Sequence, residues 1–508
     1  MTTTERRPEP QLVHGHAGMD HHRGLPDGHD ALPGDGDANG EPRRSWMVLI
    51  LALAAQVLVV LDISVVNTAL PTIGRSLNLR SGDLQWLVTA YLLTSGGGLL
   101  LGGRVADVFS RRRVFLTGMA IFTTGSMMSA LAAGPGVLIA ARAGQGLGAA
   151  LMTPAALALI MTNYTGTQRA KGLALWSAVG SMGIAAGVLF GGALTTWVGW
   201  QMIFWINVPV GAGVLIVGWF MLPKQAAAQA GSKQLDLPGG LAIVAGLGAL
   251  IFGIQAITSH GWSSPTTFGA FGLAAIMLTA FIRGEQRART PLLPPHTWRI
   301  RSLVAGTATI AGVTAVLVGL IFLTSIFCQT VLGYSALRTG LALVPLALAI
   351  TAATHLARHL LAHTSARNVA AFGLLVAAGG AFLLQRATTH PYYAASVLPG
   401  LLVLGFGAGL VFVAVFISAT AGIPAEHAGT ASGLLMTGHE IGAALGVAIL
   451  AAVSSSAGNL MSVNDSAMAT GRGFAVAGIL SIALAAVAAT TMAKTRASGQ
   501  AANHAHMH

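Results

Sequence analysis

Long apolar stretches, separated by short polar segments, follow one another from Trp46 almost to the end of the chain. A helix needs about 20 mostly apolar residues to cross the hydrocarbon core of a bilayer. Fourteen stretches come close to that length: 46–67, 86–106, 113–133, 137–161, 172–195, 202–222, 239–257, 265–283, 303–328, 336–357, 368–386, 395–418, 429–454 and 472–493. The pattern predicts an all-α polytopic membrane protein with 14 transmembrane helices.

The composition agrees with a membrane protein and excludes a soluble one. The 508 residues are 54% hydrophobic and only 9% charged, whereas soluble domains carry roughly 25% charged residues. The single cysteine, Cys328, excludes a disulfide framework and a thiolate metal site. The formal net charge is +12. The basic residues fall in short clusters between apolar stretches, however, which indicates topology signals rather than nucleic-acid binding.

Basic residues concentrate in every second connection between the predicted spans. Counted from the amino-terminal tail, these connections hold Arg43 and Arg44; Arg111, Arg112 and Arg113; Arg169 and Lys171; Lys224 and Lys233; Arg283, Arg287, Arg289, Arg299 and Arg301; Arg358 and Arg367; Lys494 and Arg496. The other connections hold only Arg75, Arg80, Arg338, Arg386 and Arg472. Because cytoplasmic loops carry the excess of Lys and Arg, both termini are expected in the cytoplasm, and the even number of spans agrees.

The two ends of the chain lack the apolar pattern. Residues 1–45 are rich in Gly, Pro, Asp and His, which predicts a disordered cytoplasmic tail. The apolar stretch that follows starts too late and is too long for a signal peptide. The carboxyl-terminal HAHMH has the composition of a weak metal site, but a disordered tail at 494–508 is the favoured interpretation. We therefore expect no metal and no cofactor.

Two short sequences recur in the two halves of the chain, in the same order. SRRRVFLTG (Ser110–Gly118) matches SARNVAAFG (Ser365–Gly373) at Ser, Arg, Val and Gly, and GLGAAL (Gly146–Leu151) resembles GFGAGL (Gly405–Leu410). Two similar bundles around a central site are a common plan of transporters. The expected domains are an amino-terminal six-helix bundle at 46–222, two linking transmembrane helices with a cytoplasmic loop at 223–300, and a carboxyl-terminal six-helix bundle at 301–493.

Four ionisable residues lie deep within predicted spans: Asp62, Arg142, His439 and Glu440. Such residues are costly in a bilayer and usually face a bundle interior or a water-filled path. At about 1.5 Å per residue, Asp62 lies roughly 24 Å from the cytoplasmic end and Arg142 roughly 8 Å from the outer end. In a core about 30 Å thick these depths nearly coincide, so the two side chains can pair if the first and fourth helices are neighbours. Glu440 lies about 17 Å deep, near the midplane.

A buried carboxyl group disfavours its charged form, so it can take up and release protons near neutral pH, and it attracts cations when ionised. Asp62 and Glu440 are therefore candidates for proton coupling or substrate binding, and Arg142 is the candidate partner that tunes a carboxylate. The alternatives are a structural salt bridge or helix-end hydrogen bond at Asp62, and contacts in a wet cavity for the pair His439–Glu440.

The connection after the second span carries the first recognisable motif. GGRVADVFSRRR resembles the signature loop of the major facilitator superfamily, G-x-x-x-D-x-x-G-R-R/K, with matches at Gly103, Asp107, Arg111 and Arg112. Ser110 stands where the motif has its second Gly. The resemblance implies that this loop latches the two halves of the protein in one conformation. Gly103 is expected to allow a close helix contact, and Asp107 to sit against a helix N-terminus or an Arg.

Two further motifs fall on the expected spans. ARAGQGLGAAL resembles the fourth-helix motif R-x-x-Q-G of the same superfamily, with matches at Arg142, Gln145 and Gly146. The resemblance implies a role in proton transfer for this Arg. GIAAGVLFGG resembles the fifth-helix antiporter motif G-x-x-x-G-P-x-x-G-G, and the matching residues are Gly183, Gly187, Gly191 and Gly192. Glycines spaced by four give a smooth stripe for close packing. Val188 replaces the Pro of the motif, so a weaker kink is expected.

The first predicted span completes the resemblance. LDISVVNTALP (Leu61–Pro71) is similar to the first-helix motif L-D-x-T-x-V-N-x-A-L-P of the fourteen-span drug:proton antiporter branch. The resemblance implies that Asp62 lies on the helix that faces the transport path. LQWLVTAYLL, IFWINVPVG and FCQTVLGYSALRTGLALVP fit the same branch. HEIGAALGVA fits its thirteenth helix, where Arg-Gln is more usual than His439–Glu440. The resemblance covers about residues 46–493 and implies the major facilitator fold.

The resemblance implies efflux of hydrophobic drugs or toxic metabolites, driven by the proton-motive force through alternating access. The expected location is a bacterial cell membrane, and the expected partners are protons, lipid and a small hydrophobic substrate. Carboxylates deep within the spans favour a cationic substrate. The protein is expected to be a monomer. The alternatives are a dedicated exporter of one metabolite, such as an endogenous antibiotic, and a non-transporting sensor. An ATP-driven pump and an enzyme are not expected, because the chain holds no GxxxxGK[ST], HExxH or GxSxG motif.

Overall fold

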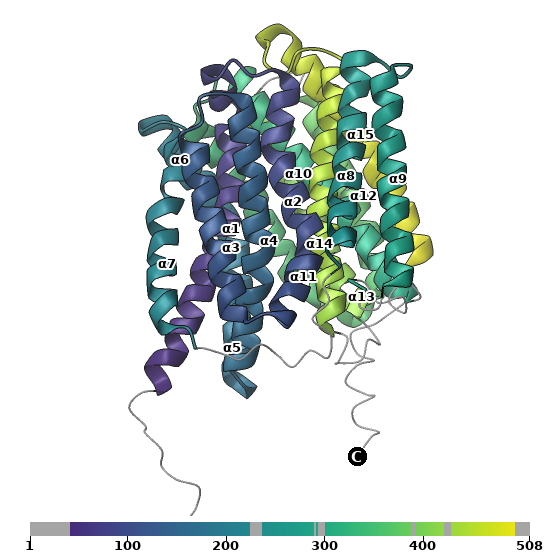
Figure 1. The fold of residues 1–508 in the computed structure, drawn as a ribbon. Helices are drawn as coiled ribbons and strands as arrows, with labels where there is room; N and C mark the ends of the chain where they lie inside the picture. The colour runs from purple at the N-terminus through teal and green to yellow at the C-terminus, as the bar shows by residue number, and fades with distance from the viewer. Residues whose placement is uncertain are drawn as a thin grey trace, which may run out of the picture. The chain divides into compact units, whose positions relative to one another are not determined.

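A computed structural model of the chain describes residues 41–223, 236–288, 291–292, 300–387, 392–420 and 428–492 (Figure 1). Every regular element in these ranges is helical. From Arg43 onward the helices belong to one compact unit. Almost all of the predicted tails, 1–45 and 494–508, lies outside the described residues. The first helix begins at Glu41, earlier than the expected Trp46.

The helices follow the predicted spans in order. The first group is α1 (Glu41–Ser76), α2 (Ser81–Val108), α3 (Arg111–Ala130), α4 (Pro135–Asn163), α5 (Gly166–Trp197), α6 (Met202–Trp205) and α7 (Asn207–Met221). Two helices follow, α8 (Leu237–His260) and α9 (Pro265–Arg287). The last group is α10 (Arg301–Thr330), α11 (Ala336–His363), α12 (Ala366–Arg386), the π-helical turn η2 (Tyr393–Val397), α13 (Leu398–Thr420), α14 (Ala428–Ser455) and α15 (Val463–Thr491). The sixth predicted span is the exception, since it is divided into α6 and α7.

Twelve helices in the described part of the chain are long and apolar enough to cross a membrane. The chain is therefore a multi-pass membrane protein. The two other expected spans correspond to α3 and α5, of which α5 contributes only the shorter apolar segment Ala186–Trp197. The α3 helix starts with three arginines and carries several Thr and Ser residues, which lower its hydropathy. The count of fourteen spans stays a prediction.

Several helix starts are fixed by capping residues that the sequence supplies. The side chains of Asp236, Ser264, Ser335 and Ser365 accept hydrogen bonds from backbone N–H groups in the first turns of α8, α9, α11 and α12. Such caps satisfy N–H groups that have no partner within a helix. Proline at the start of α4, α8 and α9 removes one of these donors.

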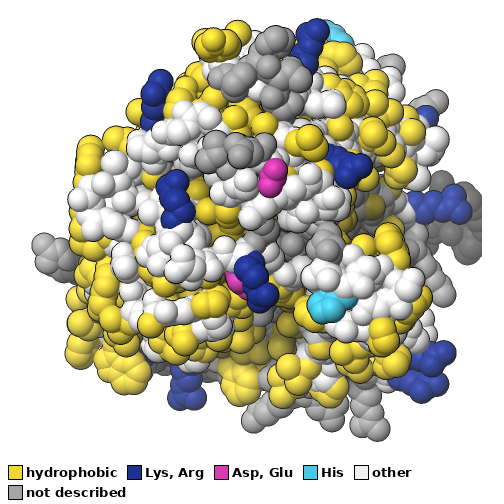
Figure 2. All heavy atoms as spheres, turned by 90° about the horizontal axis from the view of Figure 1, so that it is seen from above, with side chains coloured by type: hydrophobic (Ala, Val, Ile, Leu, Met, Phe, Trp, Pro, Cys, Tyr) yellow, Lys and Arg dark blue, Asp and Glu magenta, His cyan; other side chains and the backbone are white. Residues whose placement is uncertain are grey.

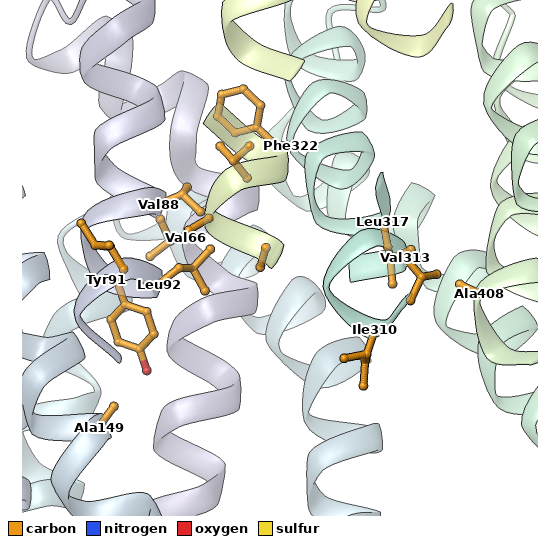
Figure 3. Packing of buried hydrophobic residues seen from close by; sticks show 14 of the residues in the cluster. Val66, Val88, Tyr91, Leu92, Ala149, Ile310, Val313, Leu317, Phe322 and Ala408 are labelled. Atoms are coloured by element: carbon orange, nitrogen blue, oxygen red, sulfur yellow. The ribbon is translucent and has the colours of Figure 1, made fainter. Parts of the chain in front are cut away.

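Helix contacts form two groups that meet along two seams. In the first group α4 packs against α2 and α3, and α7 packs against α3. In the second, α12 packs against α13 and α15, and α10 packs against α14 and α15. The groups meet where α2 contacts α14 and where α5 contacts α11. Buried apolar side chains continue through both groups, for example Val66 and Val88 on one side and Ile310 and Val313 on the other (Figure 3). The predicted domain boundaries stay a prediction.

The α8 helix lies along α2 and also contacts α14, while α9 packs on α8. Gln255 of α8 accepts a hydrogen bond from the Trp86 indole N–H at one end of α2. Farther along, Gly248 lies next to Leu93, and Gly240 next to Leu101. The two helices are therefore antiparallel and in contact over most of their length. At the end of the bundle shown in Figure 2, the basic side chains among the described residues stand singly on a largely apolar and uncharged surface.

The close approach of α2 and α4 occurs at Gly102. A methyl group on Gly102 would collide with the backbone of Ala150 and Leu151, whereas one on Gly103 would meet nothing within 4 Å. The expectation of a close contact at Gly103 is therefore wrong, because the neighbouring glycine is the one that faces α4. The two adjacent glycines provide a matched test of this packing.

We predict that Gly102→Ala lowers the stability of the purified protein by about 1–3 kcal/mol, because the added methyl group overpacks the α2–α4 crossing. Gly103→Ala should leave the melting temperature unchanged or raise it slightly, since Ala favours a helix over Gly. Thermal unfolding of both variants in one detergent measures the difference. Equal melting temperatures for the two variants would contradict the assigned register of α2 against α4.

Candidate functional site

Asp62 and Arg142 form a buried ion pair at the centre of the first helix group. Asp62 lies on α1 and Arg142 on α4, and the Nη1 atom of Arg142 contacts the Oδ2 atom of Asp62. Only 2% of Asp62 and 1% of Arg142 is exposed. The pairing inferred from their matching depths is present in the structure, which places α1 and α4 on two sides of one polar cluster.

Two amide side chains complete the coordination of the Asp62 carboxylate. Gln145 donates from Nε2 to Oδ1 at 2.9 Å, and Asn207 donates from Nδ2 to the same oxygen at 3.3 Å. Both carboxylate oxygens therefore have hydrogen-bond donors. The sequence motif pointed to Gln145, but Asn207 at the start of α7 was not recognised as a site residue. Asn207 could have been found as an amide side chain within an apolar stretch, because a buried amide needs hydrogen-bond partners.

Hydroxyl groups of α3 hold the two amides in place. Gln145 and Asn207 both donate to the Ser126 hydroxyl, at 2.9 and 3.0 Å. Ser129, one turn farther along α3, donates to Gln145 Oε1 at 3.0 Å. These serines were also missed in the sequence, because Ser in an apolar helix most often bonds its own backbone. The cluster joins α1, α3, α4 and α7 through satisfied polar groups.

The guanidinium group of Arg142 is held from a further side. Its Nε atom donates to the Leu87 carbonyl at 3.1 Å. Its Cζ atom lies 4.4 Å from the ring centroid of Tyr91 and 5.9 Å from that of Phe204. Gly146, one turn after Arg142, lies directly against the Tyr91 and Thr94 region of α2. The glycine of the fourth-helix motif therefore permits the approach that brings Arg142 to α2.

Such a cluster is stable only as a complete set. Removing two charges from water costs several kcal/mol per ion, and their attraction offsets this cost only with good geometry and additional hydrogen bonds. Here the carboxylate and the guanidinium have both. Loss of one partner leaves an uncompensated charge in an apolar interior, so a change in the protonation of Asp62 alters the whole cluster.

Glu440 lies in a second polar cluster, at the seam between the two helix groups. It is partly exposed and accepts a hydrogen bond at 3.1 Å from Ser95 Oγ of α2. The backbone at Gly96 lies close to the Glu440 side chain, so a larger residue at position 96 would collide with it. The ion pairs found among the described residues, Arg142–Asp62 and Arg80–Asp83, do not include Glu440. The neighbouring His439 Nδ1 lies 3.0 Å from Thr314 Oγ1.

The motif GGRVADVFSRRR lies at the carboxyl-terminal end of α2 and the start of α3. Arg111 and Arg112 begin α3. Arg112 donates to the backbone carbonyl of Trp219, and its guanidinium lies 5.5 Å from the centre of that ring. Arg112 therefore joins the start of α3 to the end of α7. The side chain of Asp107 lies outside those that the structure describes, and the latch function of this loop stays a prediction.

The glycines of α5 pack against two different helices. Gly183, Gly187 and Gly191 lie against Val60, Ser64 and Val65 of α1, as the spacing of four predicts. Gly192 lies against Ala336 and Leu337 at the start of α11. The stripe therefore fixes α5 on the helix that carries Asp62, and its last glycine lies at a seam between the groups. The α5 helix continues through Val188.

No group of three His, Cys, Asp or Glu side chains among the described residues could hold a metal ion. His355, His359 and His363 lie within the last part of α11 and form no such group. The HAHMH sequence lies outside the described residues.

A family model described as Major Facilitator Superfamily matches residues 52–447. The chain belongs to this superfamily. Its members are transporters of small molecules and not enzymes. The chain is 39% identical over 424 residues to the "Puromycin resistance protein pur8" of Streptomyces alboniger, covering 82% of this chain and 83% of that protein. It is 36% identical over 411 residues to the "Cephamycin export protein CmcT" of Amycolatopsis lactamdurans, covering 80% and 85%.

Other relatives of this major facilitator chain extend the comparison. The "Multidrug resistance protein Stp" of Mycobacterium tuberculosis is 32% identical over 412 residues, covering 81% of this chain and 76% of that protein. The solved structure of the xylose transporter XylE from E. coli, in an inward open conformation, has a TM-score of 0.61 at 14% identity and covers 89% of this chain and 97% of that one. A bacterial homologue of the lysosomal transporter Spinster has a TM-score of 0.59 at 19% identity, covering 88% and 96%. These two structures support the fold alone.

We predict that Arg142→Gln destabilises the protein by about 3–5 kcal/mol, because it leaves the Asp62 carboxylate buried without its cation. The double variant Asp62→Asn/Arg142→Gln should melt at a higher temperature than Arg142→Gln, since it removes both charges. Thermal unfolding of the two single variants and the double variant forms a complete mutant cycle. Additive effects of the two substitutions would show that the pair is not energetically coupled.

Proposed function

We propose that the protein exports hydrophobic drugs or toxic metabolites from a bacterial cytoplasm in exchange for protons that enter the cell. Family membership and the names of the relatives, which describe resistance and export, support the transport of antibiotics or similar compounds outward. Similarity to the fourteen-span drug:proton antiporter branch supports proton coupling. In this proposal both termini lie in the cytoplasm and the protein acts as a monomer.

The observation that carries the proposal is the buried ion pair of Asp62 and Arg142. When Asp62 takes up a proton, its negative charge is lost, and the attraction to Arg142 within an apolar interior disappears. Arg142 then retains the Leu87 carbonyl and the Tyr91 ring of α2 as its main partners. Protonation therefore weakens the connection between α1 and α4 and leaves the connection between α4 and α2.

The α1 helix also carries a contact to the second helix group, close to Asp62. Ser325 of α10 donates to the Asn67 carbonyl at 2.5 Å, and Gln329 donates to the Thr68 carbonyl at 2.7 Å. Asn67 and Thr68 lie between one and two turns after Asp62 on the same helix. A movement of α1 that follows protonation of Asp62 therefore acts directly on α10 of the second helix group. This short path supports coupling of the proton to a rocking of the two groups around a central site.

Glu440 supplies a second carboxylate on the opposite group. Its partial exposure and its place at the seam fit a role in proton coupling or substrate binding. The ring of Phe412 lies 5.9 Å from that of His439, so apolar and polar groups adjoin this position. A carboxylate beside aromatic and apolar groups would bind a lipophilic cation. A dedicated exporter of one antibiotic is the second candidate function, and the names of the puromycin and cephamycin relatives favour it.

We predict that everted membrane vesicles containing the protein accumulate ethidium when energised, and that a protonophore or Asp62→Asn abolishes the accumulation. Asn keeps the size of Asp but cannot release a proton at neutral pH. The control is Asp83→Asn, which changes a carboxylate paired with the exposed Arg80 at the start of α2 and should leave the accumulation unchanged.

Each outcome of this experiment is informative. Accumulation that survives Asp62→Asn but not the protonophore would move the coupling to Glu440. Accumulation that survives both would contradict proton-driven export. If ethidium is not transported, vesicles are tested with puromycin and a cephamycin, and transport of only one compound would establish the dedicated exporter.

We predict that a covalent link across the α5–α11 seam stops transport, because alternating access requires the seam to open. The Thr196 hydroxyl accepts a hydrogen bond from the Leu337 backbone N–H at 3.0 Å, so cysteines at these two positions lie close together. The variant is Thr196→Cys/Leu337→Cys in a Cys328→Ser background, oxidised to a disulfide. Ethidium transport should cease on oxidation and return with dithiothreitol. Undiminished transport by the fully cross-linked protein would contradict the rocking of these two helices.

A further inference from the structure

The hydroxyl group of Tyr91 has no role in the polar clusters described above. Tyr91 lies on α2 and is only 1% exposed, and its hydroxyl has no hydrogen-bond partner among the described residues. Leaving a buried polar group without a partner costs about 1–3 kcal/mol, so folded proteins rarely retain one without a reason. An aromatic side chain at this position could have been Phe without any loss of the contacts seen.

The ring that carries this hydroxyl is fixed in place. The Arg142 guanidinium lies over its face, 4.4 Å from the centroid, and this contact would be lost if the ring turned away. Figure 3 shows the hydroxyl pointing away from Val88, toward the level of Ala149. The hydroxyl is therefore directed along α2, away from the amino-terminal end of the helix.

Tyr91 lies between the two carboxylate clusters on a single face of α2. Leu87, one turn before it, accepts the hydrogen bond of Arg142, and Ser95, one turn after it, donates to Glu440. Residues four apart on a helix are neighbours on the same face. Tyr91 thus stands on α2 between the residue that contacts Arg142 and the residue that contacts Glu440.

The two carboxylates differ in their access to solvent. Asp62 is sealed at 2% exposure, and Arg142 covers one of its oxygens. Glu440 is partly exposed. A proton that reaches Asp62 in this conformation must therefore pass through buried groups, and Glu440 is the carboxylate at which it can enter.

We propose that the Tyr91 hydroxyl is a proton relay between Glu440 and Asp62, an inference that rests on the proton-coupled export proposed above. In the relay step, the Glu440 carboxyl group releases its proton through the Ser95 hydroxyl and water to the Tyr91 oxygen. Tyr91 passes its own proton through a second water to the Asp62 carboxylate, since its hydroxyl has no direct hydrogen bond to that group. The phenol is neutral before and after the step, Glu440 becomes a carboxylate and Asp62 becomes a neutral acid. One proton has moved, and no other group has changed.

The test compares Tyr91→Phe with the unaltered protein, reconstituted in proteoliposomes with ethidium as the transported probe. Phe keeps the ring beneath Arg142 and removes only the hydroxyl. Transport driven by a proton gradient should fall about a hundredfold or more, as expected when a proton-transfer group is removed. Exchange of labelled for unlabelled ethidium, which requires no net proton movement, should continue at the original rate.

The matched control is Tyr393→Phe, which removes a hydroxyl that donates to the Ala342 carbonyl at 2.8 Å in the second helix group. This variant should keep its proton-driven transport. Tyr91→Phe loses no hydrogen bond, so its melting temperature should not fall, whereas that of Tyr393→Phe should. A folded Tyr91→Phe protein therefore excludes misfolding as the cause of lost transport.

Two results would overturn the relay. Proton-driven transport by Tyr91→Phe at the original rate would show that the hydroxyl is dispensable. Loss of ethidium exchange together with driven transport would identify Tyr91 as a substrate contact or a structural residue. Failure of the unaltered protein to respond to a proton gradient, while still exchanging ethidium, would instead contradict the proposed antiport.

Discussion

A carboxylate and a guanidinium that are removed from water must satisfy each other and every remaining donor and acceptor nearby. In this protein that requirement acts on Asp62 and Arg142, and it determines the arrangement of the surrounding helices. Amide donors from α4 and α7 meet the Asp62 carboxylate, and hydroxyls of α3 hold those two amides. A backbone carbonyl of α2 accepts from Arg142. A small shift of any of these helices would leave a buried polar group without a partner, so the cluster fixes their relative positions.

The first helix links the buried cluster to the second helix group. It carries the ionisable group of the cluster, and it supplies the backbone carbonyls of Asn67 and Thr68 to the second helix group. Its contact with α5 consists of glycines set against small and β-branched side chains, a surface without deep interlocking. A helix that is held by hydrogen bonds on one side and by a smooth surface on another can move as a unit when its charge changes.

The hydrophobic pattern predicted the helices, and depth arithmetic showed that Asp62 and Arg142 could pair if the first and fourth helices were neighbours. The structure meets that condition, since the two side chains are in contact. The sequence could not identify Asn207, Ser126 and Ser129 as members of the cluster, because an isolated amide or hydroxyl in an apolar helix can bond its own backbone instead. It also expected a close helix contact at Gly103, whereas Gly102 is the residue that lies against α4, since adjacent glycines differ only in the direction each faces. Glu440 was found as a deep carboxylate, but its contact with Ser95 depends on tertiary packing that no local pattern contains.

Because of the position of α8, the α2–α14 and α5–α11 seams differ in how far they are covered from the surrounding lipid. Because α8 lies along α2 and also touches α14, it covers the seam at which Glu440 meets Ser95. No described helix of the α8–α9 pair contacts α5 or α11 extensively. A hydrophobic compound dissolved in the bilayer thus meets α8 at the α2–α14 seam. At the α5–α11 seam it meets those two helices directly. Within the described residues, α8 covers one of the two seams on the lipid side and leaves the other uncovered.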